Sequence, residues 1–248
     1  MKAVILAAGL GIRIKPLSDK KPKAFLEIEN VPLIIRSLNN LNKLGLEEIV
    51  IVVGYMEEYF KRRLGKKFKQ INISYVTNRE YMNTGSMYSL SQTKGIINDN
   101  ILLLESDLLY EKRALDFLMN SNDPNEILVA PTSGSGDEVY ICVDKNNNLT
   151  NLGKNIENKD LAIGELVGIS KLSKDFLNLL YKKAREDYDN NKKNFHYEEV
   201  IYKLSKTYPI KCRLIHDLNW IEIDTINDLN RAKKVIYPKL KKKEDNHG

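Results

Sequence analysis

Short apolar runs alternate with helical segments through the first half of the chain. Runs of the strand type, which are short and rich in β-branched residues, lie at 2–6, 48–53, 71–76, 101–105 and 126–130. Segments with helical spacing of apolar residues lie at 32–44, 56–64, 85–97 and 112–119. Strands separated by helices of this length form βαβ units, which build a mostly parallel sheet with helices on both faces. The sequence therefore predicts an α/β fold.

The pattern changes after Gly136. A hairpin is expected around Asn146 and Asn147, with arms at 138–144 and 148–153. Further strands are expected at 163–169, 210–215 and 220–223, and further helices at 174–188, 196–206 and 226–235. Because no linker separates the halves, we expect a single domain over 1–238, with 136–238 as a small β-rich lid that returns to a core over 1–135. The charge run 239–248 predicts a solvated, disordered tail.

The composition narrows the class of protein. Hydrophobic residues make up 42% and charged residues 29% of the chain, a balance that excludes wholesale disorder. Cys142 and Cys212 lie in alternating apolar runs, which predicts buried thiols in a reducing compartment. No apolar run approaches the roughly 20 residues of a membrane helix, and the N-terminus does not resemble a signal peptide. We therefore expect a cytoplasmic protein without membrane insertion.

A glycine-bearing loop follows the first strand and reads LAAGLGIRIKPLSDKKPKAFLEI. Gly9 and Gly11 allow the backbone to approach a phosphate chain with its N–H groups, but two glycines alone favour a tight turn. Arg13 and Lys23 add positive charge at the edge of the sheet where α/β proteins bind ligands. Ile14 takes the place of the third glycine of a dinucleotide-binding loop, and the chain has no phosphate-binding P-loop motif.

This loop resembles the signature of the sugar-phosphate nucleotidyltransferase superfamily, roughly L-A-G-G-x-G-x-R-L-x-P-x-T-x-x-x-P-K. Ala8, Ile14 and Ser18 depart mildly from it. Five later motifs are similar to the CTP-dependent branch, namely NTGSMYSL, LLLESDL, GDEVY, GELVGISKLSK and WIEID. The resemblance is strongest to phosphonate cytidylyltransferases, with bacterial phosphocholine cytidylyltransferases as near relatives, and it spans residues 1–238.

The resemblance implies a Rossmann-like nucleotidyltransferase fold, with a nucleotide-binding core over 1–135 and an acceptor-binding part over 136–238. It implies Mg²⁺-dependent transfer of CMP from CTP to a phosphonate, in the first place 2-aminoethylphosphonate. Phosphocholine or a sugar 1-phosphate as acceptor remains an alternative, as does a non-catalytic nucleotide-binding regulatory module. Although the net charge is +6, the basic residues are dispersed and we expect no nucleic-acid partner. The sequence leaves a homo-oligomer open.

Catalytic roles are implied for Lys23, Arg13 and Asp107. Lys23 would bridge to the acceptor phosphate, and Arg13 would hold the triphosphate. The nucleotide-binding residues implied by the resemblance are Leu6, Ala8, Gly9, Gly11, Arg13, Lys23, Asn83, Thr84, Gly85, Ser86 and Asp107.

Two aspartates are candidate metal ligands. Asp107 and Asp224 each follow a short strand, and Mg²⁺ takes oxygen ligands. Each could instead cap the following helix, and Asp224 before Thr225 fits a cap well. The residues leave these alternatives open, and the resemblance carries both aspartates over as Mg²⁺ ligands. Glu105 is a weaker candidate that could simply complete its strand.

The segment from Asn83 to Ser86 precedes an expected helix. Asn83 or Thr84 could cap that helix. The resemblance instead places this segment against the base and ribose. The sequence does not indicate which side chain selects cytosine.

An ammonium-bearing acceptor requires carboxylates. Glu165 shares an apolar strand face with Val167, a costly position for a charge, so it is either a site residue or part of a buried ion pair with Lys154 or Lys171. Glu198 is either a lid carboxylate or a favourable first-turn charge, a role more typical of Glu199. A choline acceptor would instead require aromatic rings, which Tyr81, Tyr140, Tyr197 and Trp220 could supply. The expected acceptor site comprises Asp137, Tyr140, Lys154, Glu165, Tyr197, Glu198, Trp220 and Glu222.

Overall fold

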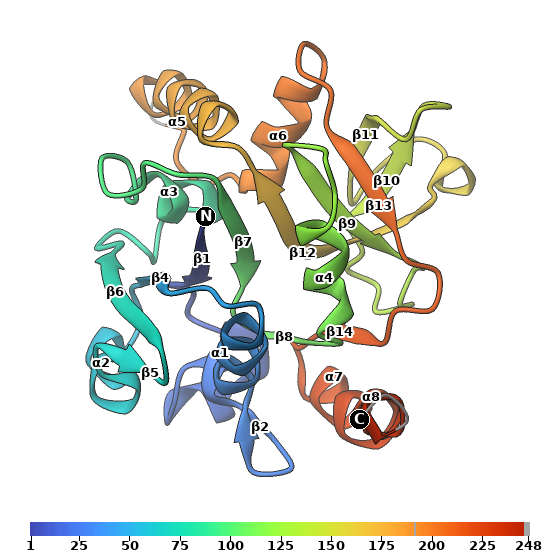
Figure 1. The fold of residues 1–248 in the computed structure, drawn as a ribbon. Helices are drawn as coiled ribbons and strands as arrows, with labels where there is room; N and C mark the ends of the chain where they lie inside the picture. Colours follow the sequence, from blue (N-terminus) through green and yellow to red (C-terminus); the bar gives the residue numbers. More distant parts are fainter. Residues whose placement is uncertain (191, 246–248) are drawn as a thin grey trace.

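The computed structural model describes residues 1–190 and 192–245. Four parallel strands form the centre of the main sheet (Figure 1). In spatial order they are β7 (Ile101–Glu105), β1 (Lys2–Ala7), β4 (Glu48–Val53) and β6 (Ile71–Thr77). The strands are largely buried because helices cover both faces, as their continuous apolar runs predicted. Their carboxyl ends lie at one edge of the sheet, which therefore receives the glycine-bearing loop.

The second half of the chain continues the same sheet with mostly antiparallel pairing. The strand β12 (Gly164–Leu172) pairs antiparallel with β7, β10 (Tyr140–Val143) and β9 (Glu126–Ala130), and its register with β9 shifts between Leu166 and Ser170. A short strand, β5, closes the opposite edge beside β6. The added strands are β5 (Lys67–Phe68), β9 (Glu126–Ala130), β10 (Tyr140–Val143), β11 (Leu149–Gly153), β12 (Gly164–Leu172) and β13 (Lys211–Leu214).

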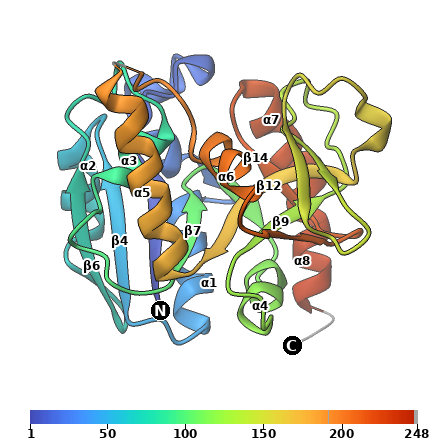
Figure 2. The same ribbon diagram turned by 90° about the horizontal axis from the view of Figure 1, so that it is seen from above.

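Helices cover both faces of this sheet, as expected (Figures 1 and 2). One face packs against α1 (Leu33–Lys43), α2 (Glu57–Leu64) and α4 (Arg113–Met119). The other packs against α3 (Ser86–Ser91), α5 (Lys174–Asp189) and α6 (Tyr197–Ser205). The expected helix over 85–97 is wrong in its second half: α3 ends at Ser91, and turns lead to Gly95, whose φ of +83° does not continue a helix.

The C-terminal region forms a third apolar core with the glycine-bearing loop. Its helices are α7 (Ile226–Arg231), a π-helical turn (Ala232–Ile236) and α8 (Tyr237–Asp245), and they pack around buried Ile14. The prediction of a disordered tail is wrong for residues 239–245, because Leu240 is buried in this core and Lys243 pairs with Asp217 at 3.0 Å. Residues 246–248 lie outside the described part. Two small two-stranded sheets complete the fold: the hairpin β2 (Glu27–Ile28) with β3 (Val31–Pro32), and the long-range antiparallel pair β8 (Leu108–Tyr110) with β14 (Trp220–Glu222).

The composition led to predictions about the two cysteines and about membrane-spanning helices. Cys142 and Cys212 are buried free thiols, as predicted. Among the helices of the described residues, each is too short or too polar to cross a membrane.

Candidate functional site

A cleft of about 620 Å³ lies at the carboxyl ends of β1 and β7. The expected site residues that line it are Leu6, Ala8, Gly9, Gly11, Arg13, Lys23, Thr84, Gly85, Ser86, Asp107, Asp137, Lys154, Glu165, Glu198, Trp220, Glu222 and Asp224. Three others, Asn83, Tyr140 and Tyr197, do not line it. Residues from both halves of the chain thus meet in one cavity.

The glycine-bearing loop presents bare backbone to the cleft. Gly11 has a φ of +62°, and its carbonyl oxygen accepts a hydrogen bond from the Ser18 hydroxyl at 2.8 Å. A Cβ atom added at Gly9 would meet nothing within 4 Å. Ile14 lies in the core and anchors the loop, which explains why an apolar residue stands at this position. The open space beside Gly9 is suited to a phosphate group.

Lys23 bridges two aspartates from distant parts of the chain. Its Nζ lies 2.5 Å from Asp107 Oδ2 and 2.5 Å from Asp224 Oδ1. Burial alone would lower the pKa of Lys23, but the charges of Asp107 and Asp224 outweigh burial and raise it. Burial likewise opposes ionisation of Asp224, yet Lys23 and Arg13 hold the pKa of that carboxyl below its usual range. Lys23 and Asp224 are therefore both charged at neutral pH.

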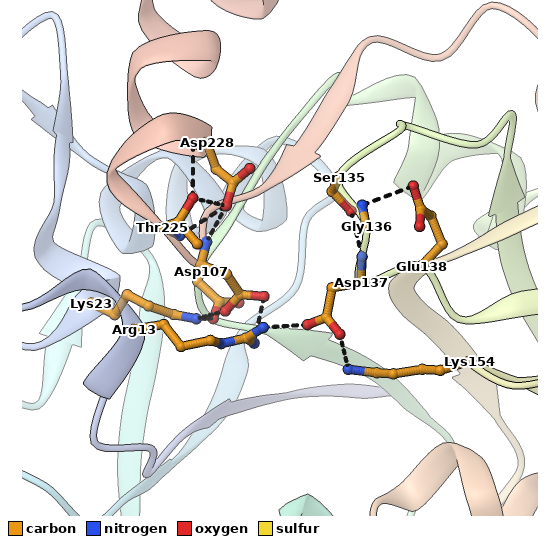
Figure 3. A network of polar contacts seen from close by, with 11 residues as sticks. Arg13, Lys23, Asp107, Ser135, Gly136, Asp137, Glu138, Lys154, Thr225 and Asp228 are labelled. Atoms are coloured by element: carbon orange, nitrogen blue, oxygen red, sulfur yellow. Dashed lines mark hydrogen bonds and ion pairs between the residues drawn. The ribbon is translucent and has the colours of Figure 1, made fainter.

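Arg13 links the loop to the second half of the chain (Figure 3). Its guanidinium pairs with Asp224 at 2.8 Å and also with Asp137. The Asp137 carboxylate in turn pairs with Lys154 on the loop after β11. Cations and carboxylates thus alternate across the mouth of the cleft, and each cation is balanced by carboxylates that a bound anion would displace.

A group of carboxylates that sequence reasoning undervalued lies beside Lys23. Oxygen atoms of Glu105, Asp107 and Glu222 lie within 4.8 Å of one another. Burial and then the charge of Asp107 raise the pKa of Glu105 to about 8, and burial raises that of Glu222 well above its usual value. The Tyr197 hydroxyl donates to Glu105 at 2.9 Å. Tyr197 was expected to contact the acceptor substrate, but it does not line the cleft and instead contacts a carboxylate that does. The sequence signal for this group was the spacing of Glu105 and Asp107, because residues two positions apart along a strand lie on the same face.

These carboxylates fit a divalent cation. Asp107 Oδ1 is buried and has no hydrogen-bond partner among the described residues. Carboxylate oxygens are the ligands that Mg²⁺ prefers, and a cation would relieve the repulsion between Asp107 and its acidic neighbours. The capping alternative for Asp224 is wrong, because Thr225 caps α7 by accepting from the Asp228 N–H at 3.2 Å.

The segment before α3 is held in place without capping by Asn83 or Thr84. The N-cap of α3 is Gly85, so the capping alternative is wrong for those two residues. A Cβ atom at Gly85 would lie 2.0 Å from the Phe195 carbonyl oxygen, which explains why glycine is needed there. Asn83 is exposed and does not line the cleft, whereas Thr84 does.

The part of the cleft formed by β12 contains a buried carboxylate. Glu165 is only 2% exposed and accepts a hydrogen bond from the Ser133 N–H at 3.0 Å. Burial raises its pKa to about 7. The ion-pair alternative is wrong, because Lys154 pairs with Asp137 and Lys171 donates to the Leu118 and Ser121 carbonyls.

At the start of α6 the two neighbouring glutamates differ in role. Glu199 accepts from the His196 N–H at 2.8 Å and completes the N-terminal cap, as expected of a first-turn charge. Glu198 lines the cleft, and burial raises its pKa. Glu138, which was not among the expected site residues, also lines the cleft and accepts from the Tyr140 hydroxyl at 3.4 Å.

Comparison with known proteins finds relatives both in sequence and in fold. The chain is 30% identical to the CMP-5'-(3-aminopropyl)phosphonate synthase of Streptomyces rubellomurinus over 118 residues, 48% of this chain and 19% of that protein. It is 25% identical to the CTP:phosphoglutamine cytidylyltransferase of Campylobacter jejuni, covering 92% of this chain and 98% of that one. The fold matches the inositol-1-phosphate CTP transferase of T. maritima with a TM-score of 0.80 at 22% identity, over 97% of this chain and 96% of that one.

Coverage differs widely among the relatives. The chain spans 19%, 51% and 50% of the lengths of three curated relatives that it matches. The sequence model of the family described as nucleotidyl transferase matches residues 2–150, which include the glycine-bearing loop, Lys23 and Asp107. The chain therefore belongs to the nucleotidyl transferase family.

Proposed function

We propose that this chain is a cytidylyltransferase that transfers CMP from CTP to a small phosphonate, in the first place 2-aminoethylphosphonate. One observation carries the proposal: Lys23 joins Asp107 to Asp224 directly beside Gly11 of the glycine-bearing loop. This arrangement combines an anion-binding loop, a buried cation and two carboxylates able to hold a metal. Relatives named for CMP–phosphonate synthesis and CTP:phosphoglutamine transfer support cytidine as the nucleoside.

The proposed reaction needs no protein nucleophile. An oxygen of the acceptor's phosphonate attacks the α-phosphorus of CTP, a new P–O–P link forms, and the bond to pyrophosphate breaks with both electrons leaving on pyrophosphate. Because the attacking oxygen is already anionic, catalysis consists of positioning and charge neutralisation. Lys23 screens the two approaching anions, while Arg13 and the backbone at Gly9 and Gly11 hold the departing pyrophosphate.

Mg²⁺ is the proposed cofactor, held by Asp107 and Asp224 with Glu222 nearby. When bound, it would neutralise phosphate charge and align the reacting groups. Arg13 and Lys23 would exchange some of their carboxylate partners for phosphate oxygens, which keeps the buried charges of the cleft compensated.

An acceptor with a primary ammonium group suits the acceptor side better than choline. Two of the four aromatic residues considered for a choline cage, Tyr81 and Trp220, line the cleft, whereas Tyr140 and Tyr197 do not. Carboxylates are more numerous there, and Glu165 is buried without the lysine partners considered for it. An ammonium group would supply the missing counter-charge.

A crossed substrate panel tests this function. Pyrophosphate release is measured with Mg²⁺ for CTP, UTP and ATP against 2-aminoethylphosphonate, phosphocholine and glucose 1-phosphate. We expect turnover with CTP and 2-aminoethylphosphonate. Turnover only with phosphocholine or the sugar phosphate would replace the proposed acceptor, and nucleotide binding without turnover would favour a regulatory module.

A further inference from the structure

The side chain of Asn78 has a fully determined orientation. Asn78 follows β6 and is completely buried. Its Oδ1 accepts from the Glu80 backbone N–H at 2.9 Å, and only the oxygen of the amide can accept that bond. The amide nitrogen Nδ2 must therefore face Thr84 and Ser89, whose hydroxyl oxygens lie 3.0 Å from it. Both hydrogens of Nδ2 are thus used.

The Thr84 hydroxyl, in a residue that lines the cleft, is consequently left with acceptor capacity only. One lone pair of Oγ1 receives the hydrogen bond from Asn78. Its own hydrogen is donated to the Glu80 carbonyl oxygen at 3.0 Å, because a carbonyl cannot donate. A hydroxyl has one hydrogen and two lone pairs, so Oγ1 can accept one further hydrogen bond and donate none.

Thr84 lies in an uncharged part of the cleft. Besides Thr84, uncharged lining residues from the end of β1 and from the 81–89 segment are Leu6, Ala7, Ala8, Tyr81, Ser86 and Ser89. The charged lining residues Arg13, Lys23 and Asp107 come from other segments. A nucleobase is uncharged and its triphosphate is anionic, so the base fits the first part and the phosphates fit the second.

The segment around Thr84 is clamped from its other side as well. The Gly85 N–H donates to the Lys193 carbonyl oxygen at 2.9 Å, and the Gly85 backbone packs directly against Phe195. Asn78 binds the Thr84 hydroxyl, and the chain before α6 holds the neighbouring Gly85 in place. The hydroxyl of Thr84 therefore cannot reorient without breaking these contacts. A preorganised acceptor discriminates more strongly than one that can rotate.

We infer that Thr84 Oγ1 selects cytosine by accepting a hydrogen bond from its 4-amino group, and that Asn78 is the positioning residue for this contact. The inference rests on the proposed function, since it concerns the base of the CTP substrate. Cytosine carries an amino donor at C4, where uracil carries a carbonyl acceptor. An acceptor that is held in place binds the amino group of cytosine. Against the carbonyl group of uracil, two acceptors would face each other with no hydrogen between them.

Nucleotide binding and turnover together test the inference. Dissociation constants for CTP, UTP and the CTP analogue that lacks the 4-amino group are measured by the fluorescence of Trp220, the single tryptophan, which lines the cleft. Wild-type protein should bind UTP and the analogue about 10- to 100-fold more weakly than CTP. Thr84→Val should abolish this preference and Thr84→Ser should retain it. Asn78→Ala should reduce it, because the released hydroxyl can also donate.

Ser91→Ala provides the matched control. Ser91 lies on α3, the helix that follows Thr84; its hydroxyl donates to the Tyr88 carbonyl at 2.7 Å and Ser91 does not line the cleft, so the preference for CTP should persist. If Thr84→Val keeps the wild-type preference while CTP is still turned over, the inference is wrong and the proposed function stands. Equal wild-type affinity for CTP and the analogue also overturns it, even if the variants fail to fold. Absence of nucleotide binding and turnover in folded wild-type protein overturns the proposed function itself.

Discussion

Lys23 and Asp224 are separated by 201 positions in the sequence, yet Lys23 Nζ lies 2.5 Å from Asp224 Oδ1. The same ammonium group contacts Asp107. Lys23 therefore ties the glycine-bearing loop to the end of β7 and to the start of α7. Because removing one member of a buried charged group leaves the others uncompensated, this contact contributes to both the shape and the charge balance of the site.

Replacing Lys23 should impair the chemical step more than nucleotide binding. Lys23→Ala is expected to lower kcat by about 100-fold or more, because the repulsion between the acceptor and the α-phosphate would no longer be screened. The KM for CTP should change less, since Arg13 and the loop backbone remain. Lys21→Ala is the matched control, because Lys21 pairs with Glu27 at 2.8 Å and does not line the cleft. Near wild-type kcat in Lys23→Ala would refute this role.

The two aspartates should determine the metal dependence. Asp107→Asn and Asp224→Asn should each abolish Mg²⁺-dependent turnover and weaken Mn²⁺ binding measured by electron paramagnetic resonance, because each loses an anionic oxygen ligand. Chelation of the wild-type protein should stop turnover, and added Mg²⁺ should restore it. Asp116→Asn on α4, where Asp116 pairs with Lys112 outside the cleft, should behave as wild type. Unchanged metal dependence in both site variants would exclude this assignment.

Glu165 should make stability depend on pH in a specific direction. Burial raises its pKa to about 7, well above the value of an exposed glutamate near 4.3. The native state therefore retains a proton that the unfolded chain releases, so the stabilising contribution is complete below about pH 4.3 and is lost as pH rises through 7. Relative to Glu165→Gln, the wild-type free energy of unfolding should fall over this range by up to about 3 kcal/mol.

Urea unfolding of both proteins between pH 4.5 and 8 measures this difference, whether or not the chain is an enzyme. A constant difference across the series would show that Glu165 is already ionised in the native protein at pH 4.5. The predicted buried neutral carboxyl would then be wrong.

The two loop glycines should respond differently to a methyl group. Gly9→Ala should leave the free energy of unfolding unchanged, because its Cβ would meet no atom within 4 Å. It should nevertheless raise the KM for CTP, since the methyl group would occupy space proposed for phosphate. Gly11→Ala should destabilise the protein by about 1 kcal/mol or more, because φ is +62° and the Cβ would lie 3.3 Å from Ser18 Cβ. Equal thermal shifts in the two variants would contradict this distinction.

Local pattern was sufficient for the central sheet and for the glycine-bearing loop. The run Glu48–Val53 forms β4 with the predicted limits, and the buried face of α1 follows its helical spacing. Such elements depend on residues a few positions apart, and parallel strands bring their carboxyl ends to one edge regardless of the details of packing. The cleft at that edge therefore follows from the order of strands and helices.

Contacts between distant segments decided the rest. Tyr197 was expected in the acceptor site, but it lies behind the cleft because Glu105 offers its hydroxyl a buried acceptor. The charged C-terminal segment is helical because Leu240 finds an apolar surface beside Ile14, a residue from the opposite end of the chain. The sequence by itself determined which residue types reach the edge of the sheet. Only the tertiary structure decided which of them meet, because a hydrogen bond or buried ion pair depends on the placement of both partners in space.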